Sequence, residues 1–134
     1  MIVVDTNVIG YLYLGSDRSM QAEQALFRDA EWAAPILWRS ELRNVLTKYI
    51  RNQWLSLEEA VHVMDEAVAL MQEREFEVSS SQVLSLAAAS ACSAYDCEFV
   101  ALAQALEVPL VTVDRQLLRH FSETAIPLED FAAQ

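Results

Sequence analysis

The chain opens with Met1-Ile2-Val3-Val4-Asp5-Thr6-Asn7, and this stretch decides the fold. Its three branched apolar residues predict a short strand. They do not alternate with polar residues, which indicates a strand buried on both faces at the centre of a parallel sheet. Ligands of open α/β sheets bind outside the carboxyl ends of the strands. We therefore expect Asp5 at a ligand-binding edge, where a buried carboxylate needs a positively charged partner.

The composition indicates one globular domain spanning residues 1–134. The chain is 54% hydrophobic and has only two glycines and three prolines, which favours a helix-rich fold with short loops. No apolar run reaches the roughly 20 residues that span a membrane, and the chain begins with a strand instead of a signal peptide. We expect a cytoplasmic protein without membrane association, in which Cys92 and Cys97 are reduced core residues.

Helical and extended patterns alternate along the rest of the chain. Helices are expected at residues 8–14, 16–30, 37–52, 57–71, 80–91, 95–106 and 115–121, and strands at 32–34, 76–78, 108–113 and from 126. The sequence Ser56-Leu57-Glu58-Glu59 predicts a capping box. The helix after it should bury an apolar stripe that includes Leu57, Val61 and Met71. The alternation predicts a three-layer α/β/α domain with a mostly parallel sheet flanked by helices.

A second acid follows a second apolar strand. Asp114 comes after Val111-Thr112-Val113 just as Asp5 comes after Ile2-Val3-Val4. If the two strands are neighbours, the carboxylates lie close together and repel each other unless a cation or a shared proton intervenes.

Two further acids lie on predicted helices. Glu41 is at the edge of the core-facing stripe of the helix from residue 37, where it either reaches inward or remains a solvated flanking acid. Asp96 shares the buried face of its helix with Phe99 and Val100. It is either a functional acid or an N-terminal cap of that helix.

The four acids together predict a site for hard divalent cations. Mg²⁺ and Mn²⁺ prefer oxygen ligands, and a carboxylate cluster holding one or two such ions suits phosphodiester hydrolysis. Thr6, Asn7 and Thr112 are candidates for orienting the acids or the substrate. The alternative for these three residues is ordinary capping and turn chemistry.

Four segments in order resemble the PIN-domain ribonucleases, in particular the compact VapC-type toxins of toxin–antitoxin pairs. They are Val4-Asp5-Thr6-Asn7, Ser40-Glu41-Leu42, residues 93–103 around Asp96, and residues 109–115 around Asp114. The resemblance covers essentially the whole chain. It implies that Asp5, Glu41, Asp96 and Asp114 bind metal in a Mg²⁺- or Mn²⁺-dependent endoribonuclease, with Thr112 as the supporting hydroxyl. It also implies a homodimer and a separate antitoxin that inhibits it.

The chain departs from this family in two respects. It has Glu107-Val108 where such proteins often have a glycine before the proline, which affects a loop outside the site. Its net charge of −11 is also less expected for an enzyme that binds RNA.

Basic residues are concentrated near the predicted third helix. Residues 39–51 carry four basic residues and one acid. We hypothesise that Lys48 and Arg51, together with Arg115 beside Asp114, contact RNA phosphates near the metal. The alternative is a solvated helix face.

Two rival functions remain at this stage. An aspartate-nucleophile phosphohydrolase usually has a second acid where this chain has Asn7, and a phosphoaspartyl domain needs a lysine after a later strand, whereas Lys48 is the only lysine. A catalytically silent PIN-like module that binds a protein partner is the second rival. His62 and His120 are the only histidines, and with no Cys-x-x-Cys motif they do not suggest a zinc site or a catalytic triad.

Overall fold

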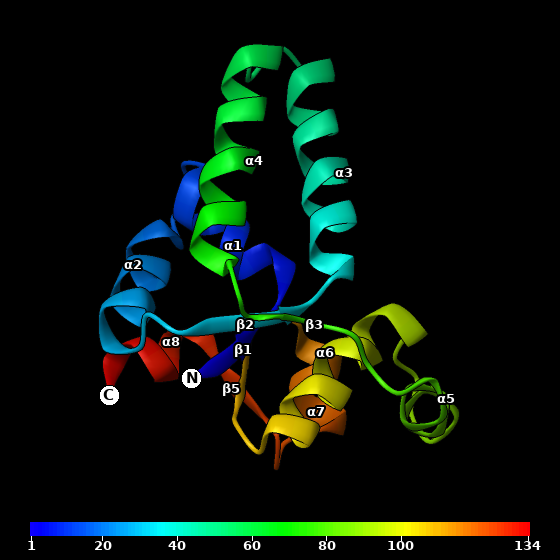
Figure 1. Ribbon diagram of the computed structural model, residues 1–134. Coiled ribbons are helices and arrows are strands. Elements are labelled where there is room, and N and C mark those ends of the chain that lie inside the picture. The colour runs from blue at the N-terminus through cyan, green and yellow to red at the C-terminus, as the bar shows by residue number, and fades with distance from the viewer.

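The computed structural model describes residues 1–134 and contains a five-stranded sheet with helices on both faces (Figure 1). The strands are β1 (Ile2–Val4), β2 (Trp32–Pro35), β3 (Glu75–Phe76), β4 (Leu110–Thr112) and β5 (Ala125–Pro127). The helices are α1 (Thr6–Tyr13), α2 (Ser19–Arg28), α3 (Leu37–Arg51), α4 (Leu57–Met71), α5 (Ser80–Ala88), α6 (Ala94–Leu106), α7 (Arg115–His120) and α8 (Leu128–Ala133). The predicted α/β architecture with a mostly parallel sheet is confirmed.

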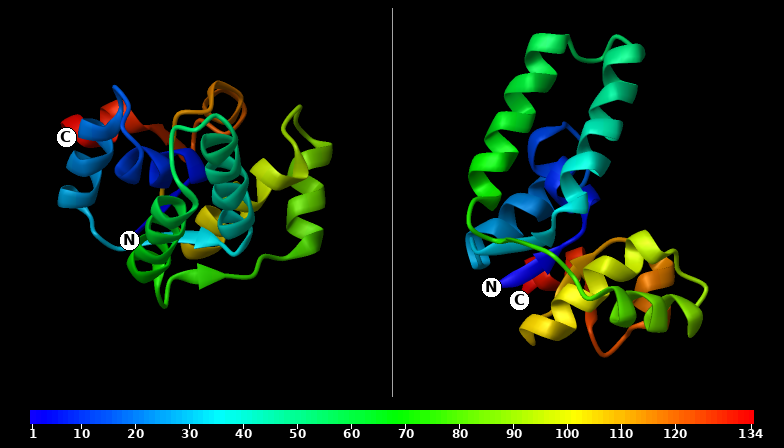
Figure 2. Two further views of the ribbon diagram at one scale, coloured as in Figure 1. Left: turned by 90° about the horizontal axis from the view of Figure 1, so that it is seen from above. Right: turned by 45° about the vertical axis from the view of Figure 1, so that its right-hand side comes forward.

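The sheet has the strand order β3-β2-β1-β4-β5, and every pairing in it is parallel. The chain moves outward from β1 to β3 and then crosses back to β4 on the other side of β1. Because parallel crossovers are right-handed, this reversal sends helices to both faces. Helices α1, α3 and α4 lie on one face and α6 on the other, as Figures 1 and 2 show.

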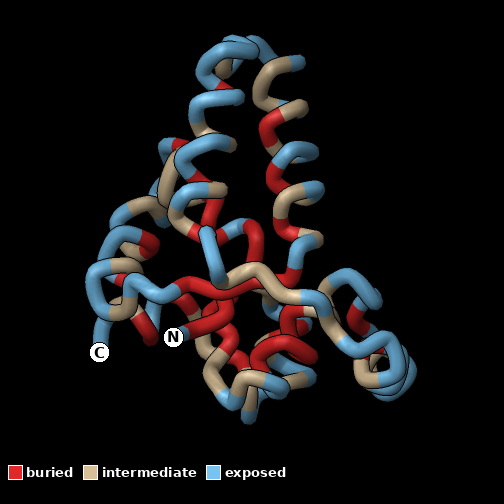
Figure 3. Tube along the Cα trace, viewed as in Figure 1, coloured by how far each residue is buried: buried red, intermediate tan, exposed pale blue.

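Strand β1 is the central strand, as its uninterrupted apolar residues predict. Val3 is paired with Ala33 of β2 on one side and with Leu110 of β4 on the other. All three β1 residues are buried. The buried positions are concentrated around the sheet (Figure 3). The neighbouring positions of β1 and β4 bring Asp5 and Thr112 to the same end of the sheet.

Helices α3 and α4 form a long hairpin that projects from the sheet (Figure 1). The predicted capping box at the start of α4 is present, since Ser56 and Glu59 exchange hydrogen bonds of 3.0 and 2.9 Å. The prediction of a buried stripe on α4 is only partly correct. Met71 is buried near the sheet, but Leu57 and Val61 are exposed because the outer turns of α4 extend beyond the core.

Several boundaries differ from the sequence prediction. Helix α5 ends at Ala88 instead of residue 91, β3 occupies Glu75–Phe76 instead of 76–78, and the C-terminal helix α8 was not predicted. Helix α8 packs against α2, a contact between elements a hundred residues apart. Glu107 ends α6 with a left-handed φ of 56°, the conformation for which glycine is best suited.

Two expectations concern residues outside the sheet. Cys92 and Cys97 are both free and buried, in agreement with the predicted reduced state. None of the helices has the length and apolar character needed to cross a lipid bilayer.

Candidate active site

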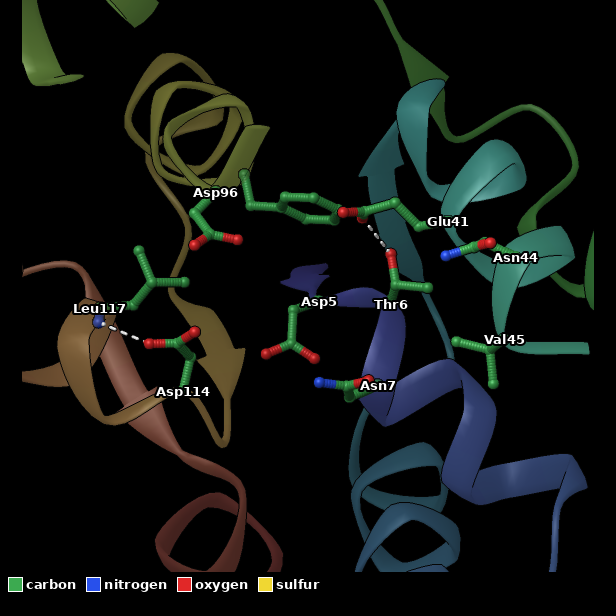
Figure 4. A pocket seen from close by; sticks show the side chains of 10 residues that line it. Asp5, Thr6, Asn7, Glu41, Asn44, Val45, Asp96, Asp114 and Leu117 are labelled. Carbon is green, nitrogen blue, oxygen red and sulfur yellow. Dashed lines mark hydrogen bonds between the residues drawn. The ribbon is translucent and has the colours of Figure 1, made fainter. Parts of the chain in front are cut away.

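The four predicted acids line one pocket at the carboxyl ends of β1 and β4 (Figure 4). They come from four separate parts of the chain, namely the ends of β1 and β4 and the helices α3 and α6. The pocket has a volume of about 200 Å³, which is ample for a hydrated ion. Its walls are formed by Asp5, Thr6, Asn7, Glu41, Asn44, Val45, Asp96, Phe99, Asp114 and Leu117.

Asp5 lies at the centre of the pocket and is only 7% exposed. It is the N-cap of α1, where Oδ1 accepts a 3.1 Å hydrogen bond from the Val8 amide. Its Oδ2 accepts hydrogen bonds from the Thr112 hydroxyl and, at 3.4 Å, from the Val113 amide. These contacts hold the carboxylate in one orientation.

Asp114 is held by the first turn of α7, as Asp5 is held by the first turn of α1. It is the N-cap of α7, and its Oδ1 accepts hydrogen bonds from the amides of Gln116 at 2.8 Å and Leu117 at 3.1 Å. Its Oδ2 accepts no hydrogen bond from the chain. The fully buried Thr112 connects the two acids, because its hydroxyl donates to Asp5 and accepts a 3.0 Å bond from the Asp114 amide.

Glu41 approaches from the opposite wall of the pocket (Figure 4). The hydroxyl of Thr6 donates a 2.6 Å hydrogen bond to its Oε1. This contact selects the inward-reaching alternative for Glu41 over a solvated flanking acid.

Asp96 is the least restrained of the four acids. The N-cap of α6 is Ser93, whose hydroxyl accepts a 3.1 Å bond from the Asp96 amide. The alternative role of Asp96 as that cap is therefore wrong, because a serine three residues earlier already occupies the position. The half-buried carboxylate of Asp96 caps no backbone amide and points into the pocket (Figure 4).

The pocket is electrostatically uncompensated. Burial raises the pKa of Asp5, and the Asp114 carboxylate raises it further against the lowering effect of the Thr112 and backbone hydrogen bonds. Burial also raises the pKa of Glu41, with Asp96 and Asp5 adding repulsion, and the pKa of Asp96, with Asp114 adding repulsion. No Lys, Arg or His lines the pocket.

The donor set fits a hydrated divalent cation. The pocket offers carboxylate oxygens, the amides of Asn7 and Asn44, and no sulfur or imidazole ligand, which is the set that Mg²⁺ and Mn²⁺ prefer. No three His, Cys, Asp or Glu side chains converge closely enough to enclose an ion directly. That spacing suits Mg²⁺, which keeps several of its waters and binds through one or two carboxylates.

The remaining predicted residues divide into two groups. Thr6 and Asn7 line the pocket, and Thr112 lies directly behind it. Lys48, Arg51 and Arg115 do not line it and are exposed. Asn44 is a pocket residue that was not among the predicted site residues, although its position one turn after Glu41 on the same helix face could have identified it.

Comparisons with known proteins agree with this architecture. The chain is 32% identical over 130 residues to Ribonuclease VapC3 of Pyrobaculum aerophilum, covering 94% of this chain and 98% of the relative. The crystal structure of PAE2754 from Pyrobaculum aerophilum superposes with a TM-score of 0.75 at 23% identity, over 99% of this chain and 97% of the other.

Two further structures have the same fold. A toxin–antitoxin complex from Klebsiella pneumoniae gives a TM-score of 0.72 at 16% identity, covering 96% of this chain and 98% of the matched chain. FitAcB from Neisseria gonorrhoeae gives 0.75 at 14% identity, with the same coverage of both chains. The model of the PIN domain matches residues 2–124. The chain therefore belongs to the PIN-domain family.

Proposed function

We propose that the protein is a Mg²⁺- or Mn²⁺-dependent endoribonuclease that hydrolyses RNA phosphodiester bonds, built as a single PIN domain over residues 1–134. The observation that carries this proposal is the meeting of Asp5, Glu41, Asp96 and Asp114 in one pocket without a basic residue. The 32% identity to a protein named Ribonuclease VapC3 supports the same chemistry. Bound divalent ions would supply an activated water and neutralise charge on the phosphate.

The residues have distinct roles in this proposal. Asp5 and Asp114 are metal ligands with fixed orientations, because helix-terminal amides hold one oxygen of each. Asp96 and Glu41 would act from the two opposite walls, largely through the waters that the ion keeps. Thr112 and Thr6 orient Asp5 and Glu41 respectively by donating hydrogen bonds to them.

Neutral and basic groups would bind the substrate. The amides of Asn7 and Asn44 face the pocket without adding negative charge and can hydrogen-bond to a phosphate or a water. Lys48 lies about two turns beyond Glu41 on the same side of α3, at roughly 10 Å by helical rise. Lys48, Arg51 and Arg115, which do not line the pocket, would contact RNA phosphates near the metal.

The relatives also support a proposal about the biological setting. We propose that the protein is the toxin of a type II toxin–antitoxin pair, inhibited by a separate antitoxin chain, homodimeric, and active in the cytoplasm. One structure with the same fold is that of a toxin–antitoxin complex, which supports the antitoxin partner. The acidic pocket would favour an antitoxin that inserts a basic side chain.

The two rival functions fit the pocket less well. An aspartate nucleophile needs an oxygen free to attack, whereas both oxygens of the buried Asp5 accept hydrogen bonds. A silent binding module has no need of three carboxylates whose pKa values are raised by their burial, since such a cluster destabilises the fold at neutral pH.

Cleavage of RNA under controlled metal conditions tests the proposal. The wild-type protein should cleave RNA with Mg²⁺ or Mn²⁺ and lose this activity in EDTA. The Asp96→Asn variant should be at least a hundredfold slower, because it removes a ligand and keeps the side-chain shape. The matched control is Glu98→Gln, which changes an acid on the same helix that lies outside the pocket. Equal rates for wild type and Asp96→Asn would refute the proposal.

A further inference from the structure

Trp54 is unusually exposed for a tryptophan. It lies in the turn between α3 and α4, at the tip of the projecting hairpin (Figure 1), and is 65% exposed. The other two tryptophans, Trp32 and Trp38, are fully buried. Trp54 makes an edge contact with Tyr49, with ring centroids 5.2 Å apart and planes at 82°, which leaves an indole face uncovered by that contact.

Two tyrosines connect Trp54 to the carboxylate pocket. Tyr49 is one helical turn beyond Val45 on α3, and Tyr11 is one turn beyond Asn7 on α1. Both Val45 and Asn7 line the pocket, and residues four apart on a helix share a face. Helices α1 and α3, which carry Tyr11 and Tyr49, pack against each other. Neither tyrosine hydroxyl forms a hydrogen bond within the chain, unlike that of Tyr13, which donates to Glu66.

The segment that carries Tyr49 and Trp54 has a charge opposite to that of the whole chain. Residues 42–57 contain Arg43, Lys48 and Arg51 but no acid, in a protein with a net charge of −11. None of the three is paired with an acidic side chain, since the basic side chains engaged in ion pairs are Arg39 and His62. Lys48 follows Glu41 along α3, and the tip is about 15 Å from Glu41 by helical rise.

We propose that Trp54, Tyr49 and Tyr11 form a base-stacking track that leads a single-stranded segment of RNA from the carboxylate pocket to the tip of the α3–α4 hairpin. Aromatic side chains bind single strands by stacking on successive bases, and neighbouring basic groups hold the backbone. The three aromatic residues provide the first element and Lys48 and Arg51 the second. This inference rests on the proposed ribonuclease activity and adds the residues of this chain on which the bases of the strand would stack.

Fluorescence tests the track independently of cleavage. Because Trp32 and Trp38 are fully buried, acrylamide should quench chiefly Trp54. An unstructured single-stranded RNA oligonucleotide, titrated into the Asp96→Asn protein to prevent cleavage, should protect this emission from acrylamide. RNA that binds, as measured by anisotropy of a labelled oligonucleotide, but leaves Trp54 open to acrylamide would overturn the inference.

Substitutions measure the contribution of stacking. Trp54→Ala should weaken RNA binding by roughly 5- to 150-fold, the range for one stacked base, and should raise KM for cleavage with little change in kcat. Trp54→Phe should retain most of the affinity because it keeps an aromatic face, and a thermal melt of each variant checks the fold. The matched control is Phe27→Ala on α2, which removes a 94% exposed aromatic residue away from the pocket.

The outcomes separate the track from the catalytic proposal. Cleavage by the wild type with an unchanged KM in Trp54→Ala would overturn the track and leave the ribonuclease assignment intact. Protection of Trp54 by RNA without any cleavage would support the track and refute the assignment. Absence of both RNA binding and cleavage would overturn both proposals. Protection of Trp54 by a protein partner but not by RNA would overturn the track.

Discussion

The Thr6 hydroxyl donates a 2.6 Å hydrogen bond to Oε1 of Glu41 and thereby joins the first turn of α1 to α3 across the pocket. Thr6 is itself only 7% exposed. The contact fixes Glu41 through Thr6, the residue that directly follows Asp5, another acid of the site. The geometry of the four acids therefore depends on hydroxyl groups as well as on the acids themselves.

Thr6→Val is expected to reduce the rate of RNA cleavage by roughly 10- to 100-fold, the usual effect of removing a group that orients a metal ligand. Valine keeps the shape of threonine but leaves Glu41 without its donor. Thr6→Ser is the matched control and should retain most of the activity. Steady-state cleavage rates at several Mn²⁺ concentrations measure the effect, and an unchanged rate for Thr6→Val would show that Glu41 needs no such support.

Thr112→Val should destabilise the metal-free protein by about 1.5–3 kcal/mol, the cost of losing a hydrogen bond to a charged group. The fully buried hydroxyl both donates to Asp5 and accepts from the Asp114 amide. Urea denaturation measures the change. The control Thr47→Val removes a hydroxyl that bonds only to the Arg43 carbonyl of its own helix, and should change stability by less than about 0.5 kcal/mol.

Asp96→Asn should make the metal-free protein more stable at pH 7 by roughly 0.5–1 kcal/mol, although it removes activity. Burial and the neighbouring Asp114 raise the pKa of Asp96 above its ordinary 3.8. A pKa that is raised in the folded state stabilises the fold when the pH is below the ordinary pKa. This stabilisation is lost as the pH rises through the raised pKa.

The difference in thermal melting temperature between Asp96→Asn and wild type should therefore shrink as the pH falls toward about 4. Saturating Mn²⁺ should reverse the order, because the ion stabilises only a protein that binds it. A difference that does not vary with pH would contradict the electrostatic origin of the effect.

Glu75→Ala should destabilise the fold by about 1–3 kcal/mol, since it leaves a buried donor without its acceptor. Glu75 accepts hydrogen bonds from the indole of the fully buried Trp38 at 2.7 Å and from Arg39 at 2.6 Å, which positions the first turn of α3. The Arg39 contact lowers the pKa of Glu75 below its ordinary 4.5. This stabilisation is present above pH 4.5 and is lost as the pH falls through the lowered value.

Urea denaturation at pH 7 and at pH 3 measures the effect of Glu75→Ala. The exposed neighbour Glu77 provides the control substitution Glu77→Ala, which should be close to neutral. Equal stability of the two variants at pH 7 would mean that the contact with Trp38 contributes nothing.

The sequence predicted which acids come together better than it predicted the periphery of the fold, for physical reasons. Asp5 and Asp114 each follow an apolar strand, and strand ends in a parallel sheet meet at one edge, so local pattern was sufficient to bring them together. The alternative for Asp96 as a helix cap was wrong because Ser93 is an equally good cap three residues earlier.

Features that depend on tertiary packing could not be predicted in this way. Helix α8 is a six-residue helix without a side-chain cap, and it packs against α2 through contacts that no local pattern reveals. Leu57 and Val61 follow the spacing of a buried stripe, but the length of the hairpin carries them beyond the sheet.

In the proposed function, Asp5, Glu41, Asp96 and Asp114 form one metal site that serves RNA cleavage. The most direct test is Mn²⁺ binding, measured as the loss of the free-ion signal in electron paramagnetic resonance. Wild type, Asp96→Asn and Glu98→Gln are compared, and RNA cleavage is measured on the same samples. We predict that Asp96→Asn loses at least tenfold in Mn²⁺ affinity together with cleavage, whereas Glu98→Gln retains both. Wild-type Mn²⁺ affinity and cleavage in Asp96→Asn would contradict the claim.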